Sequence, residues 1–79
     1  MNPPRNDPPA IDPKILEDFR LEHPSWTHEV RPAPPDSPGA WQVGIINELG
    51  LLIEYAVRKD ADEAFREAVK RAEEKPGEQ

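Results

Sequence analysis

Two histidines, one serine and their neighbours are the residues of this chain whose types and spacing could do chemistry. Ser25 lies between His23 and His28 in the sequence, and a hydroxyl beside an imidazole base is the arrangement that nucleophilic catalysis needs. Ser25 also follows Pro24 directly, and serine is common at turns because its hydroxyl binds the local backbone. We expect the turn role, and we predict that the chain has no catalytic residue.

The same two histidines are the only ones in the chain, and Glu22 and Glu29 stand beside them as possible metal ligands. Their spacing fits no standard metal site, so we expect histidines at the surface or the edge of the core, with no metal and no cofactor. The chain has no cysteine, which excludes disulfides, zinc–thiolate sites and thiol catalysis. It also lacks a GxSxG motif, a phosphate-binding glycine loop and an HExxH motif, so we predict a protein that is not an enzyme.

The charge balance limits the classes of partner. The 79 residues include 10 Lys and Arg against 16 Asp and Glu, which gives a net charge of −6. Phosphate backbones favour clustered basic side chains through counterion release, so nucleic acid and anionic membranes are poor candidates. An acidic surface usually keeps a protein soluble, and here it also suits a basic protein partner.

The length allows a single domain with a modest core. Residues 1–10 contain four prolines and almost nothing apolar, so we predict a disordered tail without a secretion signal. We expect one domain over residues 11–75 and a C-terminal tail over 76–79. The longest apolar run is too short to span a bilayer and contains Glu54, so we predict no membrane contact and a cytoplasmic location, which a cysteine-free domain fits.

The candidate residues must be positioned by a helix and a strand near the start of the domain. A helix is predicted over residues 13–22, where Asp12 suits the capping position and Pro24 ends the helix. Alternation from Trp26 to Arg31 then predicts a strand with Trp26, His28 and Val30 on one side. The prolines of residues 32–38, together with the glycine at 39, mark a loop.

Residues 40–59 can be interpreted as one helix or as a β-hairpin. One helix would carry Gly44 and Gly50 inside it, at a cost of about 1 kcal/mol each relative to alanine. A hairpin uses Glu48-Leu49-Gly50 as a three-residue loop with glycine at the left-handed position. This register pairs apolar side chains on one face of the sheet and leaves Gln42, Gly44, Glu54 and Arg58 on the other. The predicted pairs are Ile45 with Ile53, Val43 with Tyr55, and Trp41 with Val57.

A second helix follows, with Asp60 as its cap and Glu63 three residues later, the spacing of a capping box. Apolar residues recur at helical spacing from Ala61 to Ala72, and Asp62–Arg66 and Glu67–Arg71 are possible i,i+4 ion pairs. The resulting fold class is α+β: a small three-stranded antiparallel sheet in the order α-β-β-β-α. We expect both helices to cover one face, with Phe19, Phe65 and Val69 packed on Trp41, Val43, Ile45, Ile53 and Tyr55.

The order of elements over residues 12–75 resembles a double-stranded-RNA-binding domain. In that family the second helix begins with a lysine-rich motif that grips phosphates. The corresponding positions here include Asp60, Asp62 and Glu63, so the charge is reversed. The resemblance therefore implies the fold without the RNA-binding function.

Residues 27–74 are also similar to the N-terminal domain of HicB-type antitoxins. A strand is followed by Gly39-Ala40-Trp41-Gln42-Val43, then Glu48-Leu49-Gly50, and then Asp62-Glu63-Ala64 opens an alanine-rich helix. This resemblance implies binding and inhibition of a small RNA-cleaving toxin. The Pro-Gly-Cys turn that is common in that family is absent here, and the third strand is longer.

The leading hypothesis is a non-enzymatic protein-binding module, such as an inhibitor, an antitoxin-like factor or an accessory subunit. Its candidate contacts are an acidic ridge formed by Asp60, Asp62, Glu63 and Glu67, and Trp26 as an aromatic anchor. A homodimer through an edge strand is a further expectation, because three strands leave edges to protect. The alternatives are a nucleic-acid-binding domain of the RNA-binding fold, a small all-helical interaction protein, and a small enzyme or metal protein.

Overall fold

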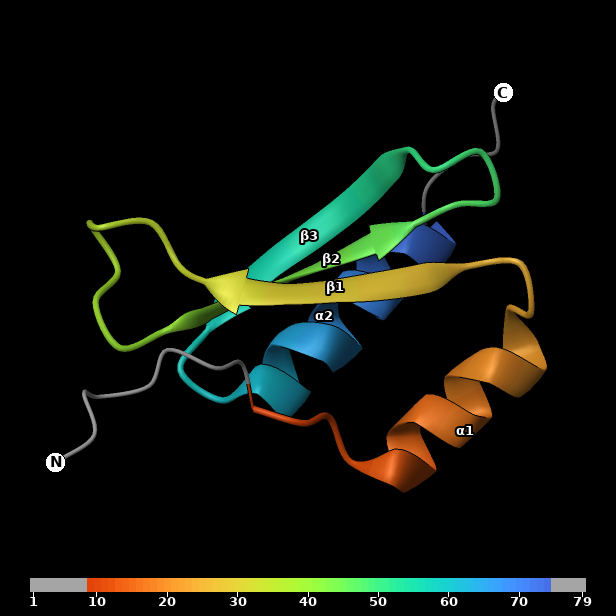
Figure 1. Ribbon diagram of the computed structural model, residues 1–79, viewed down its shortest axis with the longest axis horizontal. Coiled ribbons are helices and arrows are strands. Elements are labelled where there is room, and N and C mark those ends of the chain that lie inside the picture. Colours follow the sequence, from red (N-terminus) through yellow and green to blue (C-terminus); the bar gives the residue numbers. More distant parts are fainter. Residues whose placement is uncertain (1–8, 75–79) are drawn as a thin grey trace, which may run out of the picture.

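The computed structural model describes residues 9–74 and has the predicted α+β fold (Figure 1). Along the chain, one helix is followed by three strands and a second helix, in the order α-β-β-β-α. The elements are α1 (Pro13–Glu22), β1 (Thr27–Pro32), β2 (Trp41–Ile46), β3 (Leu52–Arg58) and α2 (Ala61–Glu74). Residues 1–8 and 75–79 lie outside the described residues. They include most of the predicted N-terminal tail, the last residue of the predicted domain and all of the predicted C-terminal tail.

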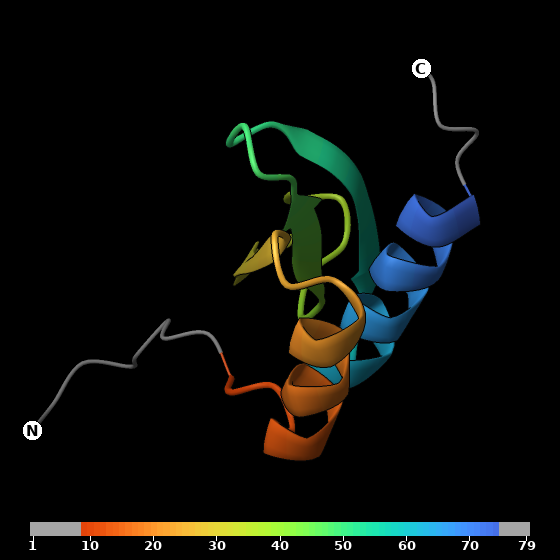
Figure 2. The same ribbon diagram turned by 90° about the vertical axis from the view of Figure 1, so that its right-hand side faces the viewer.

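The strands form one antiparallel sheet in the order β1-β2-β3. Both helices lie on one face of this sheet, as Figure 2 shows, and the opposite face has no element of residues 9–74 over it. Neither described helix is long and apolar enough to cross a membrane.

Helix α1 begins and ends where the sequence indicates. The Asp12 carboxylate accepts a hydrogen bond from the Lys14 backbone N–H at 2.9 Å, which satisfies one of the free amides of the first turn. At the other end the His23 N–H donates to the Phe19 carbonyl at 2.8 Å. The chain then leaves the helix, because Pro24 disfavours helical geometry at the residue before it.

The hairpin interpretation of residues 40–59 is confirmed, and the single-helix and all-helical alternatives are wrong. The Asn47 N–H donates to the Leu51 carbonyl at 2.9 Å, and the Asn47 side-chain oxygen accepts from the Leu49 and Leu51 amides. Gly50 has a φ of 80°, a conformation that favours glycine. The loop Glu48-Leu49-Gly50 is therefore the predicted one.

The predicted register of this hairpin is right only next to the loop. Ile46 pairs with Leu52, which fits the predicted register. Ile45 then pairs with Glu54 instead of Ile53, so an irregularity at Ile53 shifts all later pairs by one residue. Such a bulge places two residues of one strand against one of its partner. As a result, Tyr55 pairs with Gly44 on the uncovered face instead of facing the helices.

The small size of Ala56 explains why this register is favoured. Ala56 pairs with Val43 on the helix side of the sheet and is fully buried. Ala64 and Ala68 of α2 are also fully buried, so α2 lies close against β3. A tyrosine ring at the position of Ala56 would force the helix away. Glu54 and Arg58, predicted for the open face, instead pair with Ile45 and Trp41 on the helix side.

The core is closed by aromatic rings from both helices. The Phe19 and Phe65 rings meet edge-on with centroids 5.1 Å apart, and both side chains are at least 96% buried because their exposed fractions are 4% and 1%. Val69, Trp41 and Ile53 are partly buried against this core, whereas Tyr55 is 47% exposed and lies outside it. The buried core residues are Ile11, Phe19, Val43, Ile45, Ala56, Ala61, Ala64, Phe65, Ala68 and Ala72.

Candidate functional site

The acids of the proposed ridge have structural partners at the start of α2. Asp60 caps the helix, since its carboxylate accepts from the Asp62 N–H at 3.0 Å. The Asp62 carboxylate accepts in turn from the backbone N–H of Asp12 at 3.1 Å. This hydrogen bond links the start of α2 to the residue that caps α1.

Glu67 is also engaged. Its carboxylate accepts from Arg71 Nε at 3.0 Å, the predicted i,i+4 pair, and lies 3.9 Å from Arg58 Nη2 of β3. Glu63 is exposed and makes no hydrogen bond or ion pair with the described residues, and the expected Asp62–Arg66 pair does not form among them. The ridge therefore offers Glu63 as its most accessible carboxylate.

Trp26 packs against the protein instead of standing free in solvent. Its ring stacks on the His23 imidazole at a centroid distance of 4.0 Å and an interplanar angle of 8°. Its centroid is also 6.5 Å from that of Phe19. Trp26 is half-buried, so it presents only part of its ring to a partner.

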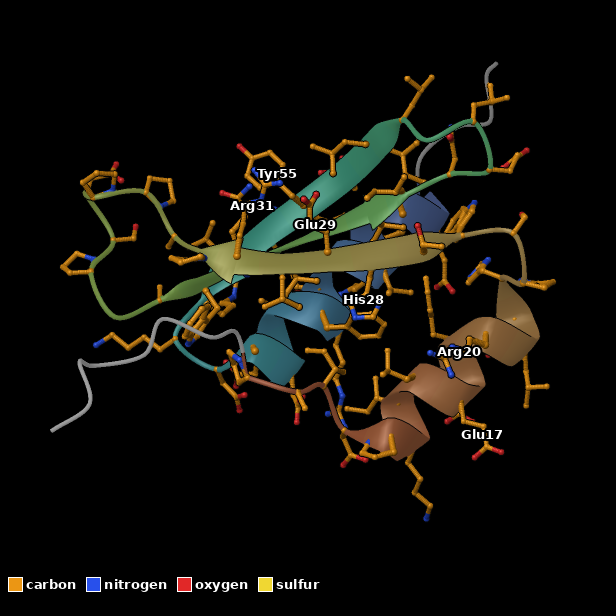
Figure 3. The ribbon with its side chains drawn as sticks, in the orientation of Figure 1. Glu17, Arg20, His28, Glu29, Arg31 and Tyr55 are labelled. Carbon is orange, nitrogen blue, oxygen red and sulfur yellow. The ribbon has the colours of Figure 1, made fainter. Side chains whose placement is uncertain are left out.

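His28 points from β1 towards the helices (Figure 3), and its ring packs against two phenylalanine rings. The ring centroids of Phe65 and Phe19 lie 5.3 and 6.4 Å from that of His28, both in edge-on geometry. Burial of the imidazole, with a smaller contribution from the Arg20 guanidinium, lowers the pKa of His28 from its ordinary value of 6.5. His28 is therefore a neutral member of the core edge at pH 7.

His23 lies beside carboxylates from the ends of both helices. His23 Nε2 is 2.7 Å from a Glu73 carboxylate oxygen, and Glu22 is the third member of this group. Glu29, a metal-ligand candidate in the sequence, pairs with Arg31 on the other side of the sheet. The sequence could not indicate Glu73, because 50 residues separate it from His23.

Four large apolar side chains are exposed in β3 and in the loop that precedes it. Leu49 is 76% exposed, Leu51 58%, Leu52 54% and Tyr55 47%. We call these four residues the hairpin patch. Sequence reasoning placed Tyr55 in the core and did not find this surface, because the bulge at Ile53 turns Tyr55 outwards.

Gly44 shapes the sheet beneath the hairpin patch. A Cβ atom at this position would lie 2.6 Å from Leu52 Cδ1, a distance that is too short without movement of the leucine. The absence of a side chain thus lets Leu52 lie across β2, and Gly44 itself is buried. A hollow of about 300 Å³ is lined by Leu52, Ile53, Glu54 and Tyr55.

A charged pair from β1 borders this apolar surface. Glu29 and Arg31 form an ion pair, and Figure 3 shows both side chains and Tyr55 pointing away from the helices. Glu29 and Tyr55 belong to the same row of the sheet, since both pair with Gly44. The open face thus combines exposed apolar groups with a neutralised charge pair.

No protein-family model, curated protein or solved structure matches this chain.

The bond between Asp62 and Asp12 predicts unequal roles for the two acids in the first turn of α2. We expect Asp62→Ala to lower the free energy of unfolding by about 1 kcal/mol, the usual contribution of one hydrogen bond. Glu63→Ala is the matched control and should stay within about 0.5 kcal/mol of the wild type. Urea unfolding followed by circular dichroism measures both values, and equal losses would contradict the assigned role of Asp62.

The lowered pKa of His28 predicts a loss of stability on acidification. As the pH falls below 6.5, the unfolded state takes up the proton before the folded state does, so the free energy of unfolding decreases. The contribution of His28 to the free energy of unfolding is fully present above pH 6.5. It disappears as the pH falls through the lower pKa that His28 has in the folded protein. We expect His28→Gln to lose less stability than the wild type between pH 7.5 and 5.5, measured by urea unfolding. Identical losses would contradict the assignment.

Proposed function

We propose that this protein is a non-enzymatic binding module that docks a basic protein partner on the open face of its sheet. The hairpin patch is the proposed contact, with Tyr55 as its aromatic group. The observation that supports this proposal is the one-sided layering of the fold. Both helices cover the same face (Figure 2), and large apolar side chains remain exposed at the other face and its hairpin.

The chemistry of the hairpin patch suits a protein surface better than a small ligand. Clustered exposed apolar side chains are typical of protein–protein contact regions, and tyrosine is enriched among the residues that dominate binding energy. The adjacent Glu29–Arg31 pair resembles the polar rim of such interfaces. Since this pair is exposed, it contributes little stability and is free to rearrange against a partner.

The overall charge favours a basic partner. A net charge of −6 attracts a positively charged protein over long distances and accelerates its association. Glu63 adds accessible negative charge at the start of α2. In this proposal electrostatics bring the partner close, and the hairpin patch supplies the short-range contacts.

An inhibitor or antitoxin-like role is one form of this function. The resemblance to HicB-type antitoxins implies a small RNA-cleaving toxin as the partner. The first turn of α2 carries Asp62 and Glu63, where the RNA-binding family has lysines, so direct RNA binding is not proposed. The reducing cytosol is the proposed location, since it suits a domain without cysteine. The edge-strand homodimer, through β1 or β3, stays a prediction that light scattering of the purified chain tests.

Two leucines of the hairpin patch provide a direct test. We expect Leu49→Ser/Leu51→Ser to weaken partner binding roughly tenfold or more, since the loss of two buried contacts costs about 1.4 kcal/mol or more. Leu21→Ser is the matched control, because Leu21 is 75% exposed and lies on α1. The measurement is recovery of the partner with the tagged chain from its source lysate, with and without nuclease and at two salt concentrations.

The proposal requires a nuclease-resistant partner that the double variant loses and the Leu21→Ser variant retains. Equal recovery by all three proteins would remove the hairpin patch from the interface. Recovery that disappears with nuclease would instead identify nucleic acid as the ligand.

A further inference from the structure

We infer that Glu22, His23 and Glu73 form a binding site for Zn²⁺ between the ends of α1 and α2. The ligand atoms of these three side chains all lie within 4.8 Å of one another. Glu22 is the last residue of α1, His23 caps that helix, and Glu73 lies in the last turn of α2. The site thus joins two elements that are far apart in the sequence.

The spacing of the three groups is close to what zinc requires. Zinc bonds to imidazole nitrogen and carboxylate oxygen are about 2.0–2.2 Å long, so tetrahedral ligand atoms lie roughly 3.4 Å apart. His23 Nε2 and the Glu73 oxygen are 2.7 Å apart and have to separate slightly around an ion. Glu22 and Glu73 are exposed at the ends of their helices, where rotation of flexible side chains permits this adjustment.

The imidazole is held in a fixed orientation for this role. The backbone of His23 is anchored by its hydrogen bond to the Phe19 carbonyl at 2.8 Å. Its ring lies flat on the Trp26 ring at 4.0 Å, which leaves Nε2 directed at Glu73. A ligand fixed before the ion arrives loses less conformational entropy on binding.

The ligand types select the class of metal ion. Mg²⁺ and Ca²⁺ prefer oxygen ligands alone, whereas an imidazole nitrogen suits Zn²⁺ and related transition ions. Two carboxylates balance the charge of a divalent cation. Three protein ligands leave a fourth tetrahedral position for water or for a group of another protein.

The clearest test removes Glu22, because this residue takes no part in the His23–Glu73 contact. We expect calorimetric titration of the full chain with Zn²⁺ at pH 7.5 to give one saturable site, and Glu22→Gln to weaken it roughly tenfold or more. Glu17→Gln is the matched control, since it makes the same change of charge on an exposed residue of α1. It should leave the affinity unchanged.

Two further readouts complete the experiment. Co²⁺ in place of Zn²⁺ should give the visible absorption of a low-coordinate nitrogen and oxygen site, and His23→Ala should abolish it. Zn²⁺ should raise the melting temperature of the wild type, because ligand binding to the folded state stabilises it, whereas Mg²⁺ at the same concentration should not. Absence of saturable Zn²⁺ binding, or equal affinity of the wild type and the Glu22→Gln variant, would overturn the inference.

Discussion

The packing of Phe65 against Phe19 and His28 is the contact on which the rest of this structure depends. It brings together α2, α1 and β1, since the three ring centroids lie 5.1 to 6.4 Å apart. Rings of this size account for much of the apolar surface that a small domain can bury. Because both helices are needed to enclose them, neither is left to cover the opposite face of the sheet.

The local elements were predictable because their signals lie within a few residues of one another. The Asp12 cap, the stop before Pro24 and the loop closed at Gly50 each follow from neighbouring residue types. The bulge at Ile53 could not be predicted from neighbouring residues, because it depends on how closely α2 approaches β3. Pairing Tyr55 with Val43 buries more apolar surface in the sheet alone, but Ala56 at that position lets the helix pack. Tertiary packing thus decided the register, and with it the side of the sheet on which Tyr55 lies.

The candidate sites were predictable to a smaller extent for the same reason. Asp60 was correctly assigned as a cap from its position before a helical pattern. The partners of Asp62 and His23, by contrast, lie 50 residues away in the chain, so no local spacing indicates them. The acids that were predicted to form one ridge therefore have different roles in the structure. Asp62 accepts a hydrogen bond from the Asp12 backbone at the start of α1, whereas Glu63 stays accessible.

The central claim is that partners contact the open face of the sheet and not the helices, and site-specific photo-crosslinking tests it most directly. A benzophenone amino acid would replace Tyr55 in one protein and Leu21 of α1 in another, each expressed in the cells that make this chain. The account predicts an adduct with a second protein from position 55 and none from position 21. Adducts from position 21 alone would place the interface on the helices and contradict the account.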